Sequence, residues 1–172
     1  MRRVFQHTIA VGMLLFGSSV AALAQTYPDH PIRVVVPFGA GTGIDGISRI
    51  VAHHLSEALK QPIVIENKPG ALGTIGATFA ARAKPDGYTL LIAANTTHSA
   101  APTLVKNIAY DPIKDFVPIA RLGTLPSMLL VYPGSSIHSV KDMVEYAKAN
   151  PGKLTYATGN STGIVTGATL RR

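Results

Sequence analysis

The sequence contains no cysteine, which excludes disulfide bonds, thiolate catalysis and cysteine-ligated metal sites. A chain without thiols tolerates an oxidising compartment without requiring one. The sequence also shows no set of histidines and carboxylates at the spacing of known metal ligands. His53 and His54 are adjacent on a predicted helix, where neighbouring side chains diverge by about 100°. We therefore expect them not to chelate one metal together, and we expect neither a metal nor a cofactor.

Dense clusters of positive charge are absent as well. The 172 residues include 16 Lys and Arg against 9 Asp and Glu, a formal net charge of +7 at pH 7. Like charges never form a run of about five or more, and aromatic residues make up 6% of the chain. Proteins that bind nucleic acids cluster their charges and interleave aromatic side chains, so we expect no nucleic-acid partner. A general attraction for anions fits the charge.

The chain has no long uninterrupted apolar run. Its longest, Ile9–Leu23, contains two glycines and two serines and falls short of the roughly 18 apolar residues of a membrane anchor. Arg2 and Arg3 precede it, and a small-x-small end allows cleavage after Ala24, so residues 1–24 are predicted to be an export signal. The arginine pair also resembles a twin-arginine signal, and the Sec and twin-arginine routes both stay open.

Strand-like and helix-like patterns alternate through residues 32–106. The run Ile32–Val36 is apolar except at Arg33 and predicts a buried strand. Apolar residues then recur at helical spacing through Ile44–Leu59. The pattern continues with a strand at 63–65, a helix at 74–83, a strand at 88–93 and a short helix at 103–106. This alternation predicts an α/β fold with a parallel sheet covered on both faces.

The later residues continue this alternation without closing a domain. Strands are predicted at 117–122, 128–131 and 154–157, and Ser139 is predicted to cap a helix at 140–149. A polar loop at 158–162 leads into a helix that has hardly begun at Arg172. Because a last strand and helix need neighbours, we expect this sequence to be the first half of a longer protein. The alternative is a small domain that ends on a short helix.

A glycine-rich loop, Pro37–Gly46, lies between a predicted buried strand and a predicted helix. Free backbone N–H groups and the helix dipole at such a position favour an anion. Asp45 falls in the first helical turn, where a carboxylate is favoured in any protein. In a functional interpretation, Asp45 accepts hydrogen bonds from the loop or from an ordered water and so shapes an anion pocket.

The same loop offers a second interpretation. Residues Gly41–Gly46 read G-x-G-x-x-G, and Glu66 follows 20 positions later, which is the spacing of a dinucleotide-binding site. A dinucleotide-dependent oxidoreductase is therefore the alternative function. The export signal weighs against it, and Pro37–Ala40 lengthens a turn that should be tight.

Two further polar segments follow predicted strands. Gly159–Gly163 reads G-x-S-x-G, as in a hydrolase nucleophile elbow, but no Asp, Glu or His follows it in the chain, and that fold needs both an acid and a histidine there. We therefore interpret this match as a coincidence. Asn95–His98 is a predicted polar loop at the carboxyl end of a strand, where His98 is a candidate for either a ligand contact or a turn role.

A series of linked motifs runs through the whole segment after the signal. The motifs are Tyr27–Phe38, the glycine-rich loop ending in Asp45, Glu66–Gly70, Gly73–Ala77, Lys84–Leu91, Tyr110–Pro112, Lys114–Phe116, Asn150–Leu154 and Tyr156–Ala157. In content and order they resemble those of one known family, the Bug-type (TctC-type) receptors of tripartite tricarboxylate transporters. One departure is Ile44, where the family often has a small polar residue.

The resemblance implies a periplasmic binding protein-like α/β fold with two parallel-sheet lobes. Residues 25–125 would form the N-terminal segment of the first lobe, and residues 126–172 the start of the second. Such receptors are non-enzymatic and hold a small mono-, di- or tricarboxylate through backbone N–H groups and ordered water. We expect a periplasmic monomer that passes its ligand to membrane permease subunits. Beside the dinucleotide-dependent oxidoreductase, the other alternative is a non-functional receptor fragment.

The ligand-binding residues that the resemblance implies fall in three segments, two that hold the carboxylate and one that lines the site. They are Gly41, Thr42, Gly43, Ile44 and Asp45 in the first; Asn95, Thr96, Thr97 and His98 in the lining segment; and Gly159, Asn160, Ser161 and Thr162 in the last.

Overall fold

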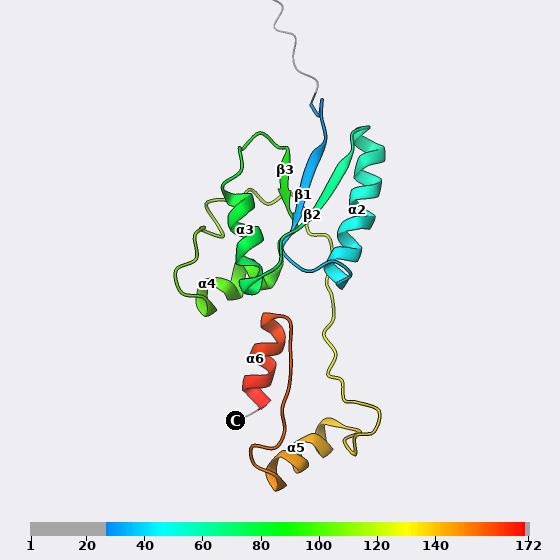
Figure 1. The fold of residues 1–172 in the computed structure, drawn as a ribbon, viewed down its shortest axis with the longest axis vertical. Coiled ribbons are helices and arrows are strands. Elements are labelled where there is room, and N and C mark those ends of the chain that lie inside the picture. Colours follow the sequence, from blue (N-terminus) through cyan, green and yellow to red (C-terminus); the bar gives the residue numbers. More distant parts are fainter. Residues whose placement is uncertain (1–26, 171–172) are drawn as a thin grey trace, which may run out of the picture.

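The computed structural model describes residues 27–170 and contains a three-stranded parallel sheet (Figure 1). The strands are β1 (Ile32–Val36), β2 (Ile63–Asn67) and β3 (Thr89–Leu91), in the spatial order β2-β1-β3. Both neighbours of β1 run parallel to it. The strands predicted within residues 32–93 thus form the predicted parallel sheet, while the predicted export signal at 1–24 lies outside the described residues.

Helices cover both faces of this sheet. Helix α2 (Gly43–Leu59) connects β1 to β2, and α3 (Thr74–Ala81) connects β2 to β3. The two crossovers run in opposite directions across the sheet, so right-handed connections place the helices on opposite faces. Helix α2 packs against β2 and β1, and α3 packs against β3 and β1. The α/β architecture predicted from the alternating pattern is confirmed.

The core is centred on β1. Its side chains are buried except that of Arg33, as the apolar run predicts. The 3-10 turn η1 (Ala71–Gly73) precedes α3 and brings Gly76 against the chain after β1. A Cβ atom at Gly76 would lie 2.9 Å from the Cα of Pro37 and 2.8 Å from the carbonyl oxygen of Lys68. Only glycine allows so close an approach of α3 to the sheet.

The chain after β3 is helical, whereas a polar loop was predicted. The π-helix η2 (Thr96–Ala100) runs directly into α4 (Ala101–Leu104), and Val105 returns to an extended conformation. The predicted loop at Asn95–His98 is therefore wrong, and the predicted short helix begins two residues early, at Ala101. The Tyr110 hydroxyl donates to the Thr97 carbonyl at 2.6 Å and ties the following segment back to η2.

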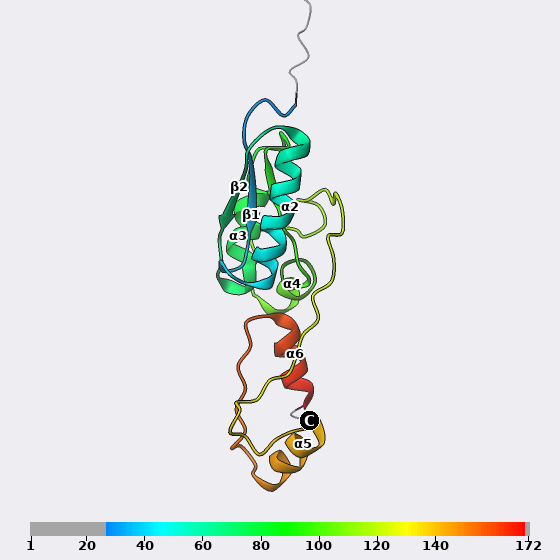
Figure 2. The same cartoon turned by 90° about the vertical axis from the view of Figure 1, so that its right-hand side faces the viewer.

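Two further helices lie beyond the carboxyl ends of the strands (Figures 1 and 2). Helix α5 (Val140–Ala149) is capped by Ser139, whose side chain accepts a hydrogen bond from the Asp142 N–H at 3.1 Å, as predicted. Helix α6 (Ser161–Leu170) contacts η2. Figure 2 shows the long connection between α4 and α5 running past α6 as an extended chain.

The strands predicted at 117–122, 128–131 and 154–157 do not form in the described part of the chain. A strand needs a hydrogen-bonded neighbour, and none of the residues from 27 to 170 pairs with these segments. Apolar side chains there stay in solvent, with Val117, Met128 and Leu130 at 88%, 81% and 79% exposure. Local sequence preference alone therefore does not produce a strand here.

No helix within residues 27–170 combines the length and the apolar character needed to cross a membrane.

Candidate functional site

The first candidate segment forms the entry into α2. Thr42 is the N-cap of the helix, and its hydroxyl accepts a hydrogen bond from the Asp45 N–H at 3.4 Å while it donates to the Gly39 carbonyl at 2.8 Å. Gly41 has a φ of +81°, in the left-handed region that favours glycine. Thr42 and Gly41 together turn the chain from β1 into the helix.

Asp45 holds this loop through both carboxylate oxygens. Its Oδ2 accepts from the Gly41 N–H and from Nε of Arg49, each at 2.9 Å, and its Oδ1 accepts from Nδ2 of Asn67 at 2.9 Å. The side chain is almost fully buried. The Arg49 guanidinium, followed by the Asn67 amide and the Gly41 N–H, lowers the pKa of Asp45 to about 2. Asp45 is therefore ionised at neutral pH.

The partners of Asp45 decide what it can do. Because both oxygens are occupied by protein donors, Asp45 shapes the loop instead of offering a free acceptor, and its bond from Gly41 confirms the expected bond from the loop. Arg49 neutralises its charge, so an anion beside the loop would meet little net repulsion. Gly43 and Ile44 lie in the first helical turn, where backbone N–H groups have no intrahelical acceptor.

Sequence reasoning did not identify Arg49 and Asn67 as parts of this arrangement. Arg49 follows Asp45 by four residues, a spacing that brings helical side chains together. Asn67 ends β2 directly beside Val36, the last residue of β1. The carboxyl ends of neighbouring parallel strands meet, so a polar residue there reaches the loop that follows β1, and Asn67 also donates to the Phe38 carbonyl at 3.1 Å.

The segment Asn95–His98 turns its polar groups largely inward. The Thr97 hydroxyl donates to the Ala94 carbonyl at 3.0 Å and lies 2.9 Å from Nδ1 of His98. The His98 ring is half-buried against Phe116, at 4.8 Å between ring centroids, and burial lowers the pKa of His98. Thr97 is fully buried, whereas Asn95 is exposed. Thr97 and His98 thus mainly support η2.

The third segment forms the start of α6. Gly159 and Asn160 are exposed, and the Asn160 side chain accepts a hydrogen bond from the Gly163 N–H at 2.8 Å, which caps the helix. Ser161 and Thr162 are therefore the first residues of a helix, and the prediction that they belong to a loop is wrong. Ser161 is buried and Thr162 is exposed.

Two of the three predicted segments meet in space. The hydroxyl oxygens of Thr96 and Ser161 lie 3.1 Å apart and form a buried hydrogen bond between residues 65 positions apart in the chain. This bond joins η2, at the carboxyl edge of the sheet, to the N-terminus of α6. Among the described residues, no hydrogen bond links Gly41–Asp45 to either of the other two segments.

Glu66, the acid of the dinucleotide alternative, is already paired. Its carboxylate lies 2.7 Å from Nζ of Lys68 and 3.4 Å from Nε of Arg33. Ser161, the nucleophile position of the G-x-S-x-G match, bonds to the hydroxyl of Thr96, which is not a general base. Neither arrangement resembles the catalytic or cofactor geometry that those motifs would require.

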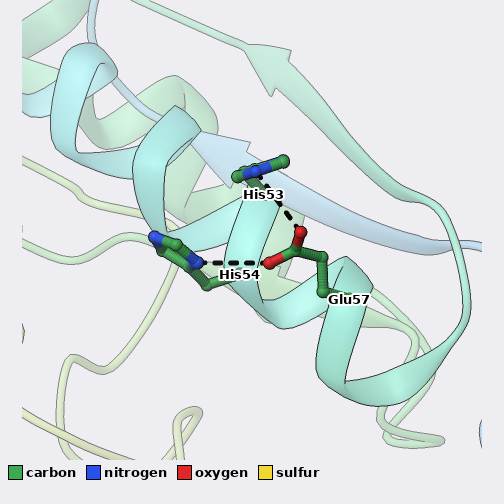
Figure 3. A group of neighbouring side chains, drawn as sticks. All are labelled: His53, His54 and Glu57. Atoms are coloured by element: carbon green, nitrogen blue, oxygen red, sulfur yellow. Dashed lines mark hydrogen bonds and ion pairs between the residues drawn. The ribbon is translucent and has the colours of Figure 1, made fainter.

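The two adjacent histidines of α2 both lie close to one acidic side chain of the same helix. His53, His54 and Glu57 bring one ligand atom each to within 4.8 Å of one another (Figure 3). Their ring nitrogens lie within 4.8 Å of each other, and the expectation that the two histidines do not chelate one metal together stays a prediction. Both side chains bend along the helix toward Glu57, which lies one turn further on, at i+4 from His53 and i+3 from His54.

A parallel α/β unit whose polar loops gather at the carboxyl edge of its sheet is the arrangement of a ligand-binding α/β protein. The fold is that of the periplasmic binding proteins. Residues 47–171 match the TctC family, described as the tripartite tricarboxylate transporter family receptor. The chain belongs to this family, which confirms the resemblance found in its sequence motifs.

Curated relatives extend the family match to nearly the whole chain. A UPF0065 protein of Bordetella pertussis is 42% identical over 94% of this chain and 49% of its own length. The protein BugT of the same organism is 34% identical over 86% of this chain and 46% of its own length. The chain thus spans about half the length of the curated relatives it matches.

Solved structures show the same fold. A periplasmic transporter aligns with a TM-score of 0.72 at 39% identity, over 84% of this chain and 49% of its own. An R. palustris protein solved with adipate aligns with a TM-score of 0.72 at 34% identity, over 78% and 45%. The protein MatC from Rhodopseudomonas palustris, solved with bound malate, aligns with a TM-score of 0.68 at 38% identity, over 72% and 42%.

Proposed function

We propose that this protein is the ligand-binding receptor of a tripartite tricarboxylate-type transporter, and that it captures a small mono-, di- or tricarboxylate in the periplasm. It performs no chemistry on the ligand and presents it to membrane permease subunits. The observation that carries this proposal is the loop at Gly41–Asp45, held by an internally neutralised carboxylate at the N-terminus of a long helix.

The physical basis of capture is the set of backbone donors in the first turn of α2. The N–H groups of Gly43 and Ile44 have no intrahelical acceptor, and the helix dipole adds about 0.3–1 kcal/mol of attraction for an anion. A carboxylate that accepts such bonds gains about 1.5–3 kcal/mol for each one. Because Asp45 is paired with Arg49, the loop can offer these donors without a buried free charge opposing the ligand.

The N-terminus of α6 supplies the second half of the proposed site. The bond between Thr96 and Ser161 ties this helix to η2, and exposed Thr162 stands in its first turn. We propose that residues 25–125 belong to one lobe and residues 126–172 to the other. A ligand held between two such lobes would stabilise a closed arrangement through a hinge motion.

The known ligands of related structures support a carboxylate. The two Rhodopseudomonas structures carry adipate and malate, which share two carboxylates and differ in length and hydroxylation. Their common chemistry matches the donors of α2, which recognise a carboxylate and not the rest of the molecule. The dinucleotide alternative gains no support from Glu66, whose carboxylate is paired.

Thermal unfolding of the full chain with a panel of carboxylates tests the proposal. A ligand that binds only the folded state raises stability by about 2.7 kcal/mol at roughly one hundred times its dissociation constant. We expect at least one di- or tricarboxylate to raise the transition, and the uncharged diamide of a dicarboxylate, the matched control, to leave it unchanged. A cooperative transition that no acid moves, or that acid and diamide move equally, would contradict the proposal.

A further inference from the structure

We propose a divalent metal site on the exposed face of α2, formed by His53, His54 and Glu57. The ion it would take is a late first-row metal such as Zn²⁺, for which imidazole and carboxylate are suitable ligands. In the described part of the chain, this is the one group of at least three histidine or acidic side chains whose ligand atoms gather closely enough to share an ion.

The distances fit a shared ion. Nε2 of His53 lies 3.6 Å from Oε1 of Glu57, and Nδ1 of His54 lies 3.3 Å from Oε2. Zinc binds nitrogen and oxygen ligands at about 2.0–2.2 Å, which in a tetrahedron separates two ligands by about 3.3–3.5 Å. Both measured separations lie close to this edge length. The two histidine nitrogens are no more than 4.8 Å apart, so a small rotation of one ring closes the third edge.

Helix geometry explains why the side chains of His53, His54 and Glu57 can converge. Glu57 lies about 6 Å further along the axis than His53, at roughly 1.5 Å per residue. Its carboxylate faces both rings, and each ring approaches a different oxygen (Figure 3). These contacts therefore hold the three ligand groups around a common point where an ion could bind.

Because the three side chains are exposed, the proposed metal site would be open to solvent. His53, His54 and Glu57 are 69%, 71% and 63% exposed. Three protein ligands leave at least one coordination position of a tetrahedral ion for water or another molecule, as in sites where the metal keeps an open position. The resulting site would exchange its ion readily.

The metal site is separate from the proposed carboxylate site. His53 follows Asp45 by eight residues, or roughly 12 Å along the helix axis at about 1.5 Å per residue. Asp45 is buried, whereas the metal ligands stand in solvent. Metal binding and carboxylate binding can therefore be tested, and can fail, independently.

Calorimetric titration of the full chain with zinc chloride, in a non-chelating buffer and without an affinity tag, tests the inference. We expect one saturable site whose affinity falls at least about tenfold in Glu57→Gln, since even the loss of an outer-shell partner weakens metal binding by about 10–100-fold. His53→Ala and His54→Ala should each have a similar effect. The matched control is His30→Ala, which removes another exposed histidine beside a carboxylate and should leave the affinity unchanged.

Proton NMR of the wild-type histidine rings gives a second readout that does not depend on any variant folding. Zinc should shift or broaden the ring signals of His53 and His54 together, at a one-to-one ratio, while those of His30 stay in place. The inference is overturned if the wild-type chain shows no saturable zinc binding, or if binding persists unchanged in Glu57→Gln and both histidine variants.

Discussion

The buried hydrogen bond between Thr96 and Ser161 should stabilise the packing of α6 against η2, and its removal tests this contribution. Thr96 and Ser161 are 5% and 1% exposed, and their hydroxyls satisfy one another at 3.1 Å. Thr96→Val removes one hydroxyl and leaves the other buried without its partner, which costs about 1–3 kcal/mol. Ser161→Ala should have an effect in the same range for the same reason.

The double variant distinguishes a real coupling from two independent losses. When both hydroxyls are removed, neither polar group is left unsatisfied, so the combined cost should be smaller than the sum of the single costs. For residues in direct contact, this difference is about 0.5–3 kcal/mol. For a chain of this size, each kcal/mol should lower the unfolding midpoint by about 2–4 °C.

The assay is a double-mutant cycle by urea and thermal unfolding, followed by far-UV circular dichroism because the chain has no tryptophan. Amide hydrogen exchange in α6 adds a local readout: Thr96→Val should speed exchange there. Thr162→Ala is the matched control, since Thr162 is the exposed neighbour of Ser161 in the same helical turn. Single-variant effects that add within about 0.3–0.5 kcal/mol, with exchange in α6 unchanged, would refute the reasoning.

Three other predictions concern separate features of the chain. Asp45 has a folded pKa of about 2, below its usual value of 3.8; the ionised form therefore stabilises the fold above about pH 4, and this contribution is lost as the pH falls toward about 2. Asp45→Asn should flatten the stability profile over that range and weaken carboxylate binding, and an unchanged profile would argue against the assigned bonds. Gly76→Ala should destabilise the chain by about 1–3 kcal/mol, because the added Cβ would overpack against Pro37. The control is Gly46→Ala: Gly46 is also helical, but no atom lies within 4 Å of its added Cβ, so this change should be neutral or stabilise by up to about 1 kcal/mol. Equal effects of the two variants in urea unfolding would contradict the packing argument. The exported protein should begin at Gln25, and mass spectrometry of a periplasmic fraction that finds only the 172-residue chain would contradict the predicted signal.

Much of the sheet and its helices could be predicted because the signals are local. Strand Ile32–Val36 is an uninterrupted apolar run except at Arg33 and lies buried at the centre of the sheet. Helix α2 shows its apolar periodicity directly, and Ser139 caps α5 as its position before the helix suggests. Each feature depends on residues within a few positions of one another, so sequence pattern alone suffices.

The candidate site could be predicted only in part. The glycine-rich loop and Asp45 were predicted as site residues because a loop that leads from a strand into the N-terminus of a helix tends to bind anions. Asn67, which holds Asp45 from the end of β2, was not identified, because it becomes a neighbour only when two parallel strands are set side by side. The helical form of Thr96–Ala100 also went unpredicted, since its polar residues are equally typical of a loop.

By itself, the sequence determined the alternation of strands and helices, the glycine-rich entry into α2 and the family motifs that place the chain among the TctC receptors. Tertiary structure alone decided which segments meet: Thr96 with Ser161, and Asp45 with Asn67. It also decided that residues 117–131 stay unpaired in the described structure despite their apolar side chains. The physical reason is that a strand and a buried hydroxyl each depend on a partner whose position the local chain does not specify.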